Sequence, residues 1–95
     1  MCARSGDLDP SIVTFLMKKE GLSSDEMDKI LNKESGAFGI SGISPDIRDI
    51  EAEAEKGNKK AILALKAYDL NIAQYIAKYA VSMGGVDIIV FTAGV

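Results

Sequence analysis

Residues 86–92 are the feature that most restricts how this 95-residue chain can fold. They form a continuous, mainly β-branched run behind a Gly84-Gly85 break, a pattern typical of a strand buried on both faces. A buried strand needs neighbours along its edges, yet the sequence contains no other convincing strand. We therefore expect sheet partners in sequence beyond this chain, pairing with a second copy, or a rearranged strand. The sequence also stops where a strand-to-helix turn would begin, so we expect it to be an excerpt of a larger protein.

The strongest helical pattern follows Asn58, a good N-cap, and covers residues 59–83. Alanines widen its apolar stripe and would allow another element to approach closely. At 1.5 Å per residue the helix would span roughly 37 Å, which is longer than a small domain needs. The apolar residues that recur at spacings of three and four are Ile62, Leu65, Tyr68, Ile72, Ile76, Tyr79 and Met83.

Two shorter helices are predicted in the first third of the chain. Asp9 caps the first, Pro10 occupies its first position, and Gly21 is its C-terminal stop. Ser23 opens a capping box for the second helix, which should end near Lys33. Both segments carry apolar residues at helical spacing, which supports the assignment.

Residues 34–50 form a glycine-studded stretch that leads into a third helix. Its three glycines are interleaved with apolar residues, so we expect a shaped loop whose side chains anchor it to a core. Ser44 is the predicted N-cap of a helix over residues 45–56. In the first turn of that helix, Asp46 and Arg48 would point in different directions and could contact two parts of one ligand.

Composition narrows the classes of function. The chain is 47% hydrophobic and 26% charged with a net charge of −3, which argues against a nucleic-acid-binding surface. No apolar run reaches the roughly 18 residues of a membrane span, and the N-terminus lacks a signal-peptide pattern, so we expect a cytoplasmic protein. The lone Cys2 can form neither an internal disulfide nor a metal cluster. Because histidine is absent, any catalysis must use carboxylates, Arg, Lys or Tyr.

Residues 39–50 read Gly-Ile-Ser-Gly-Ile-Ser-Pro-Asp-Ile-Arg-Asp-Ile and resemble the G-I-S-G-x-S-x-D-x-R-D-I segment of acetate kinases. Residues 4–10 and 83–95 resemble two further segments of that family, in the same order and at compatible spacing. The resemblance implies that residues 1–95 are a single partial domain, an excerpt of the C-terminal, nucleotide-side domain of an acetate kinase. It also implies an α/β fold of the actin-like and sugar-kinase (ribonuclease H-like) ATPase class, mostly helical here with one C-terminal strand.

The resemblance also assigns roles to individual residues. Arg4 matches the arginine that contacts the phosphoryl group during transfer and stabilises the transition state. The motif that contacts adenosine in the family is matched by Asp46, Ile47 and Arg48. The first two residues of a G-[IV]-G-E-N turn that packs against the nucleotide are matched by Gly94 and Val95.

Plainer interpretations of the same residues stay open. Arg4 could simply pair with Asp7 or Asp9, and Asp46 could serve only the electrostatics of a first helical turn. One departure from the family is Cys2-Ala3, which stands where Gly-Thr is usual. It alters the approach to Arg4 without changing the arginine itself.

The implied activity is reversible phosphoryl transfer from ATP to acetate, which gives acetyl phosphate and ADP. The whole enzyme would use Mg²⁺ and ATP; we expect no metal site in this chain, no cofactor bound to it, and neither nucleic acid nor a membrane as partner. Because other parts of the family's site lie outside these residues, the chain alone is expected to be inactive. A propionate or butyrate kinase and a non-enzymatic helical self-association module are the alternatives. Unpaired strand edges and an apolar helix face predict a homo-oligomer in either case.

Overall fold

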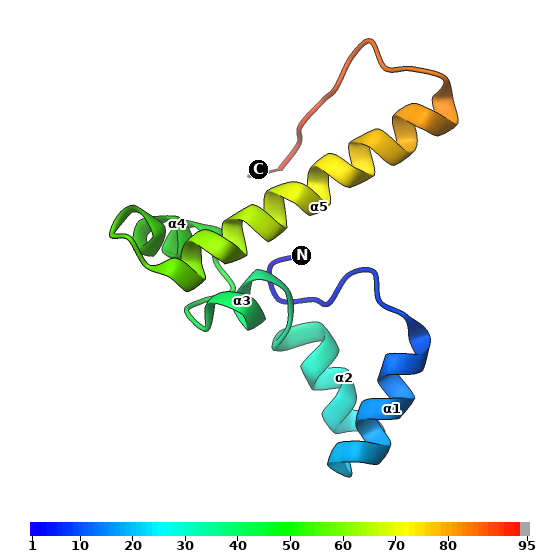
Figure 1. Cartoon of the computed structure of the whole chain (residues 1–95), viewed down its shortest axis with the longest axis vertical. Coiled ribbons are helices and arrows are strands. Elements are labelled where there is room, and N and C mark those ends of the chain that lie inside the picture. The colour runs from blue at the N-terminus through cyan, green and yellow to red at the C-terminus, as the bar shows by residue number, and fades with distance from the viewer. Residues whose placement is uncertain (94–95) are drawn as a thin grey trace.

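The fold was obtained as a computed structural model that describes residues 1–93. Within those residues the chain forms five helices: α1 (Pro10–Glu20), α2 (Ser24–Lys33), α3 (Gly36–Ser41), α4 (Ile47–Glu55) and α5 (Lys59–Met83). Figure 1 shows α1 and α2 side by side at one end of the molecule, with α5 extending from its middle toward the opposite end. Both α3 and α4 pack against α5, so the long helix is the element on which these two helices are assembled.

A small core lies where α3 and α4 meet the first half of α5. Ala61 and Ala64 of α5 are fully buried, as is Ile50 of α4. The small alanine side chains let the neighbouring helices approach α5 closely, as the alanine-rich stripe predicts. Partly buried side chains complete the packing around this core, namely Ile43, Ile47, Ala54 and Leu65.

Local capping chemistry sets three of the helix starts where the sequence predicts them. The Asp9 carboxylate accepts a hydrogen bond from the second residue of α1, and Ser23 forms a complete capping box at α2. The Asn58 side chain caps α5, whose bounds match the predicted ones. Gly21 and Gly84 end α1 and α5 in the left-handed conformation that glycine adopts without a steric penalty.

The stretch at 34–50 departs from prediction in two places. Residues that were expected to form a loop contain α3, which is short and carries the buried Ala37 and Ser41. The next helix begins at Ile47 rather than at Pro45, because Asp46 and not Ser44 is its N-cap. Both residues are good capping types; the backbone of Asp46 is extended (φ −89°, ψ 120°), which keeps Asp46 itself outside the helix.

The predicted C-terminal strand is not confirmed. In the described structure residues 86–93 form no regular element, and Ile88 and Val90 expose 81% and 75% of their surface. The physical reason is the one that the sequence raised: residues 1–93 supply no second strand to satisfy the edges of the first. Residues 1–93 are therefore mostly helical, as predicted, while the strand of the expected α/β fold stays unconfirmed.

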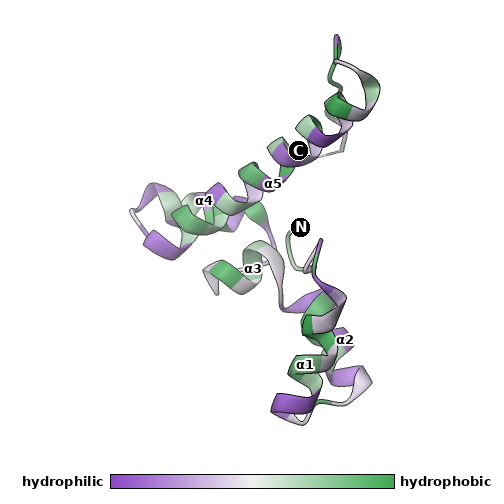
Figure 2. Cartoon of the chain, turned by 45° about the vertical axis from the view of Figure 1, so that its right-hand side comes forward, coloured by the Kyte–Doolittle hydropathy of each residue, from purple (hydrophilic) through white to green (hydrophobic). Residues whose placement is uncertain are grey.

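Hydrophobic residues continue along α5 beyond the part that α3 and α4 cover (Figure 2). Val81 and Met83, near the end of the helix, are 83% and 72% exposed. Among the helices of residues 1–93, none has the length and apolar character needed to cross a bilayer. The uncovered side chains thus form an apolar surface on a helix that does not qualify as a membrane span.

Candidate functional site

A cleft of about 860 Å³ lies beside the N-terminal end of α4 and the middle of α5. Its walls combine apolar side chains with a few charged ones, the mixture that small-molecule sites share. Four segments of the chain meet there, because Cys2 and Phe91 join residues 45–51 at the start of α4 and residues 68–76 of α5. The lining residues are Cys2, Pro45, Asp46, Ile47, Arg48, Glu51, Tyr68, Asp69, Ile72, Ala73, Ile76 and Phe91.

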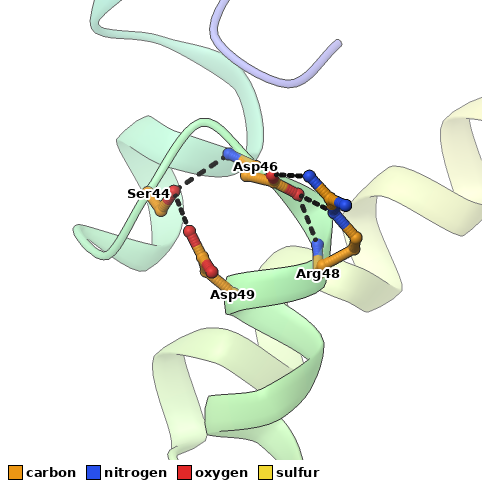
Figure 3. Close-up of polar contacts among 4 residues, drawn as sticks. All are labelled: Ser44, Asp46, Arg48 and Asp49. Carbon is orange, nitrogen blue, oxygen red and sulfur yellow. Dashed lines mark hydrogen bonds and ion pairs between the residues drawn. The ribbon is translucent and has the colours of Figure 1, made fainter.

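A network of side-chain hydrogen bonds shapes the turn that carries the charged wall of this cleft (Figure 3). The Ser44 hydroxyl donates to Asp49 Oδ2 over 2.7 Å and accepts from the Asp46 backbone N–H over 3.0 Å. The Asp46 carboxylate in turn accepts from the Arg48 backbone N–H over 2.9 Å. Ser44 therefore stabilises the turn before the helix, and Asp46 stabilises the helix start.

Asp46 and Arg48 form a two-point ion pair with each other. Arg48 Nε lies 3.1 Å from Asp46 Oδ1, and Arg48 Nη2 lies 2.6 Å from Asp46 Oδ2 (Figure 3). The prediction that these side chains diverge is wrong, because it assumed that both residues are helical. Since Asp46 precedes α4 with an extended backbone, its carboxylate turns back over the first helical residues and meets the guanidinium.

This ion pair fixes the charge of both groups. The hydrogen bonds from the Arg48 side chain and backbone lower the pKa of Asp46 from 3.8 to about 2. The same contact raises the pKa of Arg48. At neutral pH the wall thus carries an ionised carboxylate and a guanidinium joined by two hydrogen bonds.

Arg48→Ala removes the guanidinium and is expected to raise the pKa of Asp46 most of the way toward 3.8. The rise stays incomplete because the backbone N–H of residue 48 still donates to the carboxylate. A depressed carboxylate pKa adds stability above pH 3.8, and this contribution is lost as pH falls through about 2. Carboxyl NMR titration of Asp46 measures the shift directly. The matched control is Lys56→Ala, which removes the other ion pair of α4, with Glu53; an equal response to both variants would contradict the assigned cause.

Arg4 lies outside the cleft, on the same N-terminal segment as Cys2. The plainer interpretation, in which Arg4 pairs with Asp7 or Asp9, is not found: within residues 1–93 Arg4 forms no ion pair with either carboxylate. Asp7 instead accepts a hydrogen bond from the Tyr75 hydroxyl. The predicted nucleotide residues Gly94 and Val95 lie outside the described residues.

Several cleft residues were not singled out from the sequence as site residues. Tyr68, Ile72 and Ile76 fall on one face of α5 at four-residue spacing, so the helical pattern does place them together. Burial raises the pKa of the Tyr68 hydroxyl, as expected for a phenol at an apolar wall. No local signal marks Cys2 or Phe91, because the folding of the two chain ends over α5 brings them to the cleft.

Comparison with known proteins finds relatives of the chain among acetate kinases. Residues 1–95 match the Acetokinase family. The chain is 59% identical to the acetate kinase of Treponema denticola over 95 residues, which is 100% of this chain and 24% of that protein. It is 50% identical to an acetate kinase of Porphyromonas gingivalis over 95 residues. The chain therefore spans about a quarter of the length of the curated relatives it matches, 24% in these cases.

Solved structures agree in shape as well as in sequence. The crystal structure of Porphyromonas gingivalis acetate kinase superposes with a TM-score of 0.94 at 49% identity, covering 99% of this chain and 24% of that one. A propionate kinase from Francisella tularensis gives a TM-score of 0.90 at 37% identity, with coverage of 99% and 24%. Both structural matches cover 99% of this chain, so the matched region includes the residues that line the cleft.

Proposed function

The chain belongs to the acetokinase family, and on that premise we propose that it is the nucleotide-side segment of an enzyme that reversibly transfers a phosphoryl group from ATP to acetate. The observation that carries the proposal is the cleft at the start of α4, where Asp46, Ile47 and Arg48 form one wall. In this proposal residues 1–95 are part of the C-terminal domain of an actin-like ATPase fold. The sheet partners of residues 86–92 would then lie in the rest of that domain.

The chemistry of the cleft suits an adenosine group. Apolar side chains of α5, together with Ile47 and Phe91, offer surface for the faces of a purine ring. The Arg48 guanidinium can lie against the ring while it stays paired to Asp46. The Asp46 carboxylate keeps lone pairs free to accept hydrogen bonds from ribose hydroxyls or from the purine amino group. We propose that Gly94 and Val95 pack against the same nucleotide.

Arg4 is proposed to act on the phosphoryl group and not on the adenosine. Charge spreads over the equatorial oxygens during transfer, and a rigid fork of donors stabilises that distribution. Residues 1–93 hold no cluster of three His, Cys, Asp or Glu side chains that could bind a metal ion. In the proposal Mg²⁺ arrives with ATP, and the groups that hold it belong to the remainder of the enzyme.

The acceptor could also be propionate. The likeness to a propionate kinase at a TM-score of 0.90 supports this alternative, whereas the curated relatives at 50% to 60% identity are acetate kinases. We favour acetate on that ground. A comparison of acetate and propionate turnover by the full-length enzyme decides between the two.

A hybrid enzyme tests the proposed function. Residues 1–95 replace the matching quarter of Porphyromonas gingivalis acetate kinase, with which they share 50% identity. We expect this hybrid to form acetyl phosphate from ATP and acetate, while the 95-residue chain alone stays inactive because positioning requires both walls of the site. A folded hybrid without activity, or activity of the pure chain alone, would contradict the proposal.

Nucleotide binding by the chain itself is tested by thermal unfolding. The sequence led us to expect no cofactor on the isolated chain, but the cleft is already formed in the structure. We therefore expect ATP at about ten times its Kd to stabilise the folded chain by about 1.4 kcal/mol, a rise of several degrees for a chain of this size. Arg48→Ala should remove the shift, and Lys56→Ala, another exposed cation beside α4, should retain it. A shift that survives Arg48→Ala would place the nucleotide elsewhere.

The same measurement at two protein concentrations tests our proposal that the protein self-associates. Ile88, Val90 and the end of α5 expose apolar surface that a second copy could cover. A midpoint that rises with protein concentration supports association, because a dimer is favoured by mass action. An unchanged midpoint contradicts it.

A further inference from the structure

Gly36 permits a contact between two backbone segments that no other residue type could allow. Its φ is +63°, and a Cβ atom at this position would lie 2.4 Å from the Met1 carbonyl oxygen and 2.7 Å from the Arg4 carbonyl oxygen. Real Cβ atoms do not approach backbone oxygens that closely. Gly21 provides the contrast, since it has nearly the same φ, +64°, and a Cβ added there would meet no atom within 4 Å.

Backbone hydrogen bonds use this close approach to attach the N-terminal segment to the start of α3. The residues on both sides of Gly36 donate hydrogen bonds to the N-terminal segment. Ser35 N–H donates to the Ala3 carbonyl over 2.9 Å, and Ala37 N–H donates to the Met1 carbonyl over 3.1 Å. Next to Arg4, Ser5 N–H donates to the Leu31 carbonyl at the end of α2 over 2.8 Å. The backbone of Arg4 is therefore held on both sides.

A second contact ties the same segment to α5. The Tyr75 hydroxyl donates to Asp7, three residues after Arg4, and this is a contact between positions 68 residues apart. Tyr75 comes from the part of α5 that also supplies Ile72 and Ile76 to the cleft. Arg4 thus sits between an attachment to α3 and an attachment to the helix that forms the cleft wall.

We propose that Gly36 and Tyr75 are positioning residues that fix Arg4 relative to the nucleotide cleft. This inference rests on the proposed function, in which Arg4 acts on the transferring phosphoryl group. A Cβ at position 36 would have to open the contact by about 1 Å before it reached an ordinary separation. A displacement of that size in a catalytic group can lower the rate by about 100-fold.

Gly36→Ala in the hybrid enzyme is expected to lower kcat by about 100-fold while the KM for ATP changes far less, because the substitution displaces Cys2 of the cleft lining but leaves Asp46, Ile47 and Arg48 in place. Gly21→Ala is the matched control. It carries the same left-handed strain without the close approach, so its kcat should stay near that of the parent hybrid. Equal kcat values in the two variants would overturn the proposal.

A double-mutant cycle separates positioning from general destabilisation. If Gly36 acts through Arg4, the double variant Gly36→Ala/Arg4→Ala should have a kcat within about threefold of that of Arg4→Ala alone. A full loss of about 100-fold in that background would overturn the inference while leaving the proposed function standing. If Arg4→Ala alone has no effect, the role proposed for Arg4 fails instead, and the inference fails with it.

Tyr75→Phe decides the question if Gly36→Ala does not fold. It removes one hydroxyl and keeps the ring beside Tyr79, 6.1 Å away between centroids. We expect a kcat lowered by about tenfold that again depends on Arg4. Tyr79→Phe is the control on the same helix and should leave kcat unchanged; equal behaviour of the two variants would overturn the role of Tyr75.

Discussion

Arg4→Ala is expected to lower the kcat of the hybrid kinase by about 1,000-fold or more. Arginine donors that stabilise the charge of a transferring phosphoryl group contribute on the order of 10³ to 10⁵ in rate, since the protein contributes mainly positioning and electrostatics to this reaction. The KM for ATP should change little, because Arg4 does not line the cleft. Steady-state kinetics with ATP varied at saturating acetate measures both constants.

Two further variants sharpen this prediction. Arg4→Lys keeps the positive charge but loses the planar fork, so part of the rate should return. Arg48→Ala should show the opposite pattern, a raised KM for ATP with a smaller change in kcat, as expected for a residue of the binding wall. If Arg4→Ala retained kcat within about threefold, Arg4 would not contact the reacting group.

The helix starts were predictable because their chemistry is local. Asp9, Ser23 and Asn58 each cap a helix through backbone groups two or three residues away, so both partners of each contact are visible in a short stretch of sequence. The start of α4 was harder, because Ser44 and Asp46 are both good caps two residues apart. The error of two residues there also produced the wrong expectation for the Asp46–Arg48 pair.

The C-terminal run and the cleft show where local inference ends. Residues 86–92 have the composition of a strand, but a strand exists only when another strand satisfies its edges, and residues 1–93 supply none. A short motif led us to predict nucleotide contacts for Asp46, Ile47 and Arg48, and the structure places these three residues in the lining of the cleft, where their contact with nucleotide stays a prediction. The presence of Cys2 and Phe91 in that lining was not predicted, since long-range folding places those two residues there.

The close approach at Gly36 was partly predictable: more so than the cleft lining, and less so than the helix caps. The sequence indicated that the glycines of residues 34–50 can adopt positive φ, and Gly36 and Gly42 do so, but only the folded structure identifies Arg4 as the neighbour of Gly36. A glycine with open space around it, such as Gly21, looks the same in the sequence. What distinguishes them is the tertiary contact, which connects the first residue of α3 to the proposed catalytic arginine.

Ile50→Ala is expected to be the most destabilising simple substitution in the core of this chain. Ile50 has 0% exposure and joins α4 to the alanine face of α5. Truncating a buried isoleucine costs about 2 to 5 kcal/mol, through lost burial and the cavity left behind. A domain of this size has a total stability of only about 5 to 14 kcal/mol, so the loss is a large share of it.

The comparison variant is Leu63→Ala, on the same long helix but 59% exposed. It should change the free energy of unfolding by about 0.5 kcal/mol or less, since it removes few buried contacts. Urea titration gives both values. Because Ile50 holds α4 against α5, Ile50→Ala should also abolish the ATP-induced rise in unfolding temperature, whereas Leu63→Ala should preserve it. Similar stabilities for the two variants would mean that α4 is not held by this core, and the cleft wall at Asp46 would then need another support.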